Sequence, residues 1–107
     1  MIDIKELRTL AADMEKIVFT QHVLERIRKR EVEKHDLLDI IMNGEIIEQY
    51  PNDYPFPSCL ILYLKVNGKP LHLVCSMGNN KVYIITVYEP DLEHWESDFM
   101  TRKEKSK

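Results

Sequence analysis

The chain has 107 residues, of which 44% are apolar and 31% charged, and its formal net charge is −3. This length and balance predict one compact domain that needs neither disulfides nor a metal in order to fold. No apolar stretch is long enough to cross a membrane, and Asp3 stands where a signal peptide needs apolar residues, so we expect a cytoplasmic protein. Cys59 and Cys75 lack metal-binding spacing and are expected to be free, buried thiols.

Charge is distributed unevenly along the chain. Residues 22–35 carry five basic and three acidic side chains, whereas residues 36–64 carry five acidic side chains and no basic one. Residues 89–98 are acidic again. This separation predicts a basic face suited to a polyanion and an acidic face suited to another partner, although solubility alone would also explain it.

Helical spacing of apolar residues dominates the first part of the chain. Asp3 followed by Glu6 resembles a capping box, Thr20 is suited to an N-cap, and Gly44 stands where a left-handed C-terminal cap is wanted. The second helix carries an apolar face and an outward basic face. The predicted helices run from about residue 4 to 16, from 20 to about 30 and from 34 to 43.

Strand patterns dominate the second half, with a short extended piece at residues 17–19 before the second helix. Asn67-Gly68 predicts a two-residue hairpin turn, in which paired residue numbers sum to 135. That register places Tyr63 opposite His72, and Cys59 and Cys75 on opposite faces. The predicted core face consists of Leu60, Leu62, Leu64, Leu71, Leu73 and Cys75. The predicted strands are residues 45–50, 59–66, 70–76 and 81–88.

Helices followed by strands predict an α+β domain in which N-terminal helices pack on one face of a four-stranded antiparallel sheet. We expect this single domain to cover residues 1–100 and the charged residues 101–107 to fray. Leu92, Trp95 and Phe99 are expected to form a short cap over the sheet.

Two groups of residues could carry chemistry, and no motif for a cofactor or a metal accompanies them. His22, Arg26 and Arg30 share one helix and could bind a phosphate and move a proton, although a solvated helix face is the simpler interpretation. His72 in mid-strand could act as a general base or stack on a nucleobase, or it could simply hold two strands together. Side chains that could complete such a site are Thr86, Tyr88 and Arg102.

An ordered set of short motifs over residues 17–102 resembles the family called domain of unknown function 4258. The motifs are Thr20-x-His22-x-x-x-Arg26-x-x-x-Arg30, Asn43-Gly44-Glu45-Ile46-Ile47, Tyr50-Pro51, Pro57-Ser58-Cys59-Leu60, Pro70-Leu71-His72-Leu73-Val74 and Ile85-Thr86-Val87-Tyr88-Glu89-Pro90-Asp91 with Trp95. That family is similar to the RelE-like ribonuclease toxins, which pack helices on an antiparallel sheet and cut RNA without a metal. The resemblance implies RNA, either free or on a ribosome, and a neutralising antitoxin as partners.

The resemblance implies a hypothesis for catalysis by attack of a ribose 2′-hydroxyl on the adjacent phosphate. His72 is the base, His22 is the acid or a phosphate ligand, and Arg26 stabilises charge together with Arg30. Tyr63 or Tyr88 could stack on a nucleobase. The hypothesis requires that His22 and His72 converge on one cleft.

Two interpretations of other classes remain open at this stage. One is a non-catalytic module that binds a partner through its acidic segments, or a second copy through a sheet edge as a homodimer. The other is a plain nucleic-acid-binding protein, which would show salt-dependent binding without turnover.

Overall fold

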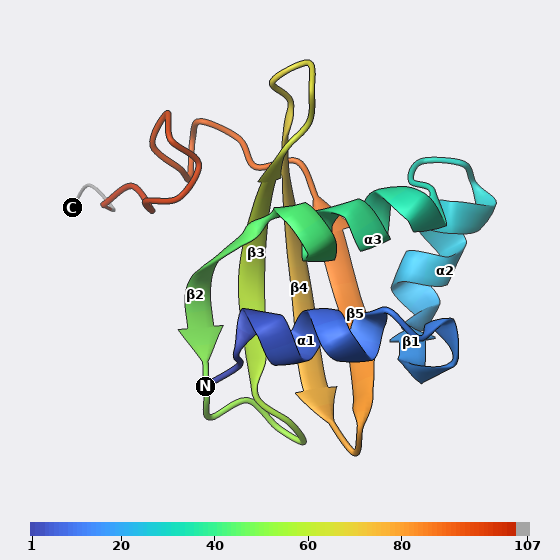
Figure 1. Cartoon of the computed structure of the whole chain (residues 1–107). Helices are drawn as coiled ribbons and strands as arrows, with labels where there is room; N and C mark the ends of the chain where they lie inside the picture. Colours follow the sequence, from blue (N-terminus) through green and yellow to red (C-terminus); the bar gives the residue numbers. More distant parts are fainter. Residues whose placement is uncertain (105–107) are drawn as a thin grey trace.

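The computed structural model describes residues 1–104, which form an α+β fold with an open, mixed sheet (Figure 1). Of the predicted tail, residues 101–107, the last three residues lie outside the described part of the chain. The helices are α1 (Ile4–Ala11), α2 (Gln21–Arg28) and α3 (Lys34–Asn43), with a 3₁₀ turn η1 (Met14–Lys16). The strands are β1 (Ile17–Phe19), β2 (Glu45–Tyr50), β3 (Ser58–Leu64), β4 (Pro70–Gly78) and β5 (Lys81–Tyr88).

The first helix begins where the sequence predicts but ends earlier. The Asp3 carboxylate accepts a hydrogen bond from the Lys5 amide at 2.8 Å, which is the expected N-cap. The prediction that the helix continues to Lys16 is wrong, because Asp13 caps a separate turn by accepting from the Glu15 amide at 3.0 Å. A short acidic side chain offers the backbone this local alternative to helix continuation.

The sheet has five strands in the order β1-β5-β4-β3-β2, so the prediction of four antiparallel strands is wrong. The segment expected only to be extended, β1, pairs in parallel with β5. Its three residues are too few to show an alternating pattern, and parallel pairing with a strand far along the chain leaves no local signal. Helices α1 and α3 cover one face of the sheet, as predicted, while α2 lies at the edge beside β1 (Figure 1).

The hairpin between β3 and β4 is shifted by one residue from the predicted register. The Lys65 amide donates to the Lys69 carbonyl at 2.9 Å, so residues 66–68 form a three-residue loop in which Gly68 has φ +85°. An Asn-Gly pair serves this loop as well as the two-residue turn, because both need a left-handed residue. Moving the register by one residue reverses the faces of the strand.

The corrected register changes the neighbours of several predicted residues. His72 lies opposite Leu62, Tyr63 lies opposite Leu71, and Cys59 lies directly opposite Cys75. The two thiols are free and buried, as predicted, but they share one face, with 3.9 Å between their sulfur atoms. The prediction that they point apart is therefore wrong.

The main core lies between the sheet and helices α1 and α3. The predicted core face was wrong for Leu60 and Leu62, which are buried on the other face of the sheet, and Leu64 is exposed. Apolar residues on both sides of β3 removed the alternation that would have shown its orientation. The buried strand residues of the core are Cys59, Ile61, Leu73, Cys75, Val82, Ile84 and Val87.

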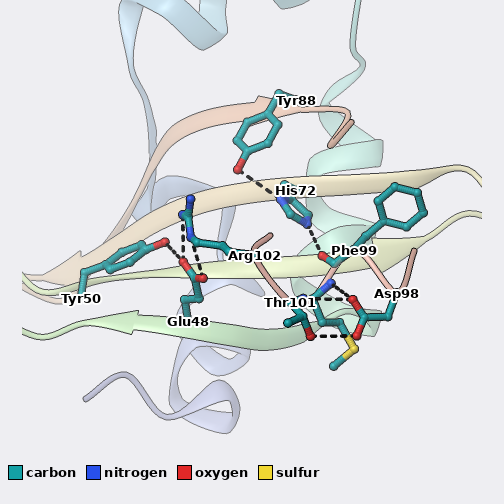
Figure 2. Close-up of polar contacts among 9 residues, drawn as sticks. Glu48, Tyr50, His72, Tyr88, Asp98, Phe99, Thr101 and Arg102 are labelled. Carbon is teal, nitrogen blue, oxygen red and sulfur yellow. Dashed lines mark hydrogen bonds and ion pairs between the residues drawn. The ribbon is translucent and has the colours of Figure 1, made fainter. Parts of the chain in front are cut away.

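A C-terminal segment, residues 89–104, passes over the sheet face that the helices leave uncovered (Figure 2). The predicted cap is confirmed for Trp95, which is 3% exposed and packs on His72, but it is wrong for Leu92, which is 55% exposed. Within the described part of the chain, the longest helix has 10 residues, and none is long and apolar enough to cross a membrane.

Candidate functional site

A cavity of about 310 Å³ lies between α2 and the last residues of β5, and we call it the α2–β5 pocket. Four side chains that the sequence singles out meet there: His22 and Arg26 from α2, and Thr86 and Tyr88 from β5. His22 is exposed at the start of the helix. The full lining is His22, Glu25, Arg26, Lys29, Glu31, Thr86, Val87 and Tyr88.

Direct hydrogen bonds hold α2 against β5. The Thr20 hydroxyl, at the N-cap, donates to the Ile85 carbonyl at 3.0 Å. One guanidinium nitrogen of Arg26, Nη1, donates to the Val87 carbonyl, while Nε pairs with Glu31 at 3.1 Å. Arg26 therefore fixes the wall of the pocket and still has N–H groups beyond these two contacts, since a guanidinium carries five donors.

Arg30 does not share the helix with His22 and Arg26, so that placement was wrong. The helix ends at Arg28, and the Arg30 and Glu31 amides donate to the Ile27 and Arg26 carbonyls at 3.0 and 2.9 Å. This is a Schellman ending, in which Arg30 takes a left-handed conformation with φ 62°. Lys29 lines the pocket instead, and its three-residue spacing from Arg26 was the sequence signal for it.

A bulge in β5 sets which of its side chains face the pocket. Cys75 pairs with Ile84 and Val74 pairs with Thr86, which leaves Ile85 as an extra residue. Ile84 and Val87 belong to the helix-covered core, whereas Ile85 and Thr86 do not. A bulge re-aims side chains in this way, and here it gives Thr86 to the pocket.

His72 is fully buried on the face of the sheet that the helices leave open, the face that also carries Tyr88, and it lies beneath the C-terminal segment. Its Nε2 lies 2.7 Å from the Phe99 carbonyl oxygen, which can only accept, so Nε2 carries the proton. Nδ1 is then the acceptor, and the Tyr88 hydroxyl donates to it at 3.1 Å (Figure 2). The Trp95 ring meets the imidazole edge-on, with 4.5 Å between the ring centroids.

These contacts favour the neutral imidazole. Burial lowers the pKa of His72 and outweighs both the Phe99 carbonyl and the negative charge of Glu48, which act in the opposite direction. His72 does not line the α2–β5 pocket, so the requirement that His22 and His72 converge on one cleft is not met. Tyr88 connects them, because it lines the pocket that contains His22 while its hydroxyl contacts His72. Burial raises the pKa of Tyr88, which keeps this hydroxyl protonated.

Arg102 lies near His72, on the helix-free face of the sheet, and does not line the α2–β5 pocket. It makes a two-point ion pair with Glu48, and its guanidinium lies 4.6 Å from the centroid of the Trp95 ring. Burial acts to raise the pKa of Glu48, but hydrogen bonds from Arg102 and Tyr50 outweigh it and the pKa is lowered. Burial, followed by the hydrogen bond to Glu48, raises the pKa of Tyr50 to about 12. Sequence reasoning missed Glu48, since its partner lies 54 residues away.

Tyr63 is half-buried against the helix-covered core, so it lies on the face of the sheet opposite His72. It does not line the α2–β5 pocket. One group of potential metal ligands occurs within residues 1–104, formed by Asp91, Glu93 and His94. All three are exposed. Asp91 Oδ1 already accepts hydrogen bonds from the backbone amides of Glu93 and His94 and from His94 Nδ1. This arrangement is explained as a capped turn.

Residues 19–89 match the family model described as Domain of unknown function (DUF4258), which is more than half of the chain. The chain belongs to the DUF4258 family. No curated protein and no solved structure matches it. The DUF4258 region includes α2, strands β2 to β5 and the whole lining of the α2–β5 pocket, whereas α1 and Trp95 lie outside it.

Proposed function

We propose that this DUF4258 protein is a metal-independent ribonuclease of the RelE-like toxin class, and that the scissile phosphodiester of RNA binds in the α2–β5 pocket. The observation that carries the proposal is the meeting of His22, Arg26 and Tyr88 in one pocket, since they come from segments about 60 residues apart in sequence. An imidazole, a hydroxyl and a guanidinium can supply the proton transfers and the charge stabilisation that metal-free cleavage of RNA requires.

A proton relay through Tyr88 accounts for the burial of His72. The Tyr88 oxygen takes the proton of the ribose 2′-hydroxyl while its own proton moves to Nδ1 of His72, 3.1 Å away. The 2′-oxygen attacks phosphorus, and protonated His22 gives its proton to the departing 5′-oxygen. The products are a 2′,3′-cyclic phosphate and a 5′-hydroxyl. Arg26 and Lys29 stabilise the charge that develops on the phosphate oxygens.

The second candidate is a non-catalytic module that binds protein or nucleic acid. Two carboxylates, Glu25 and Glu31, also line the pocket, and Glu31 already pairs with Arg26. These charges oppose an RNA phosphate and favour a cationic or neutral ligand. The outer strand β2 would provide an edge for an antitoxin or a second copy to pair with.

The deciding experiment is cleavage of messenger RNA by the purified protein in EDTA, with and without ribosomes. We expect cyclic-phosphate ends, and rates at least about 100-fold lower for Tyr88→Phe and His22→Gln, because each variant loses one proton-transfer group. His35→Gln is the matched control, since His35 is exposed and does not line the pocket. Absence of cleavage by folded protein in every condition would support the binding module. If that protein still binds RNA, with an affinity that falls steeply as the salt concentration rises, its ligand is nucleic acid.

A further inference from the structure

A second cavity, of about 200 Å³, lies between the loop before β3 and the strands β4 and β5. We call it the aromatic pocket. The loop contributes Asp53, Tyr54 and Phe56, and the strands contribute Ser76, Tyr83 and Ile85. Tyr83 and Ser76 pair across the sheet and stand outside the helix-covered core, so the floor of this pocket is the face of the sheet that the helices leave open.

Packing fixes the Phe56 side of the aromatic pocket, and a hydrogen bond fixes the Asp53 side. The Phe56 ring stacks on Tyr83 with 5.5 Å between centroids and an interplanar angle of 23°. The same ring lies against the backbone of Gly78, where a Cβ atom would overlap it. The Ser58 hydroxyl donates to Asp53 Oδ2, which holds the carboxylate at the rim.

The remaining aromatic side chain, Tyr54, is 95% exposed. A tyrosine ring that is almost wholly exposed can cover a planar ring that enters the pocket, and such stacking would bury area that the free protein leaves in water. The pocket therefore has a fixed aromatic wall, an available aromatic face and a carboxylate at its edge.

The aromatic pocket and the α2–β5 pocket are lined by consecutive residues of β5. Ile85 lines the first and Thr86, the next residue, lines the second. The bulge at Ile85 is responsible, because it keeps both side chains out of the core. A single-stranded RNA with a phosphodiester in one pocket would reach the other within a few nucleotides.

We propose that the aromatic pocket binds a guanine base of the RNA substrate, an inference that rests on the proposed function. Guanine is the base whose Watson–Crick edge presents two adjacent N–H donors, N1–H and N2–H. A carboxylate accepts such donors through both oxygens, and Asp53 Oδ1 is available beside the Oδ2 that accepts from Ser58. Stacking on Tyr54 supplies the affinity and Asp53 supplies the preference over adenine, which offers only one amino group on that edge.

The test is binding of fluorescently labelled 2′-O-methyl hexanucleotides, measured by anisotropy, with five uridines and one guanosine or adenosine. The 2′-O-methyl group removes the attacking hydroxyl, so binding is measured without cleavage. We expect the guanosine oligonucleotide to bind more tightly, Tyr54→Ala to weaken it about 10-fold and Tyr54→Phe to leave it unchanged. Asp53→Asn replaces one carboxylate oxygen with an NH₂ group, which cannot accept the guanine N–H donors. This variant should therefore abolish the preference for guanosine over adenosine.

Val66→Ala is the matched control, because Val66 is fully exposed and lies outside both pockets. Equal binding of both oligonucleotides, or binding that Tyr54→Ala does not weaken, would overturn the guanine pocket even if the protein cleaves RNA. Conversely, guanosine-selective binding by a protein that never cleaves RNA would support the aromatic pocket and reject the ribonuclease. The two proposals therefore fail separately.

Discussion

Arg102 and Glu48 form a two-point ion pair that joins the C-terminal segment to β2, with Nε 2.9 Å from Oε2 and Nη2 3.0 Å from Oε1. The same guanidinium lies over Trp95, and Trp95 packs on His72. One side chain thus connects a strand at the edge of the sheet to the cover of a buried imidazole. The geometry is bidentate, which is the strongest form of a carboxylate–guanidinium contact.

Replacing Arg102 with Gln should loosen the C-terminal segment. The Arg102 side chain is 57% exposed, so solvent screens the pair and we expect a loss of about 1 kcal/mol in the free energy of unfolding. Urea denaturation measures this loss, and acrylamide quenching of Trp95 should increase because the ring becomes accessible. Lys103→Gln is the control and should change neither. Unchanged quenching in Arg102→Gln would show that the segment is held by packing alone.

The stability of the protein should fall as the pH drops below neutrality because of His72. Burial lowers the pKa of His72 from its ordinary value of 6.5, so between that value and the lower folded pKa the unfolded chain binds more protons than the native one. The stability that the neutral His72 contributes is fully present above pH 6.5, and it is lost as the pH falls from 6.5 toward the lower pKa of His72 in the folded protein. The slope of unfolding free energy against pH, from urea titrations at pH 5 to 8, should be smaller in His72→Gln than in the wild type.

The control for that slope is His94→Gln, which replaces an exposed imidazole. Glu48 also contributes to the pH dependence of the unfolding free energy in acid. Its pKa is lowered, so the stability it contributes is lost only as the pH falls below its ordinary value of 4.5. Because the His72 contribution begins to be lost as the pH falls through 6.5 and the Glu48 contribution only below 4.5, His72→Gln should flatten the part of the slope just below pH 6.5. An identical slope in wild type and His72→Gln would contradict the neutral, buried imidazole.

Arg30→Gly should stabilise the protein. Arg30 has φ 62°, a left-handed conformation that favours glycine, and its side chain is exposed. Relief of that conformation should add about 1 kcal/mol to the free energy of unfolding, measured by urea denaturation. Lys29→Gly, at a helical φ of −79°, should instead be destabilising. A loss of stability in Arg30→Gly would mean that the Arg30 side chain makes contacts worth more than the strain.

Gly78→Ala should destabilise the fold and disturb the aromatic pocket. A methyl group at Gly78 overlaps the Phe56 ring, and forcing that ring away from Tyr83 should cost about 1–3 kcal/mol. Adding Phe56→Leu to Gly78→Ala makes room, so the double variant should lose less stability than the sum of the two single variants. Strictly additive losses in urea denaturation would argue against this contact.

Local patterns were sufficient to predict most helices and strands, and they failed where a distant partner decides the outcome. The bounds of α3, β2 and β5 follow from cap residues and strand composition that act within a few residues. The left-handed cap predicted at Gly44 is wrong, because Gly44 is extended with φ −82°. The parallel pairing of β1 with β5 depends on residues 65 positions away, as the pairs Ile17 with Val82 and Phe19 with Ile84 show. No local pattern contains that information.

The candidate site divides in the same way. His22 and Arg26 stand one helical turn apart, so the sequence could place them on a shared face, and Tyr88 follows from the end of a strand. The one-residue error at Gly68 moved Tyr63 to the wrong face, because two glycine-containing hairpin loops fit the same dipeptide. The burial of His72 could not be predicted, since it requires knowing where the C-terminal segment turns back.

The limits of the family match bear on what part of this chain can fold alone. Residues 19–89 leave out α1, which covers the core face of the sheet, and Trp95 with Arg102, which cover the opposite face. A fragment cut to those limits would expose the core residues of α3 and β5 that α1 contacts, and would leave His72 and Leu62 in water. We therefore expect the part of this chain that folds alone to extend beyond the family-matched residues 19–89 at both ends.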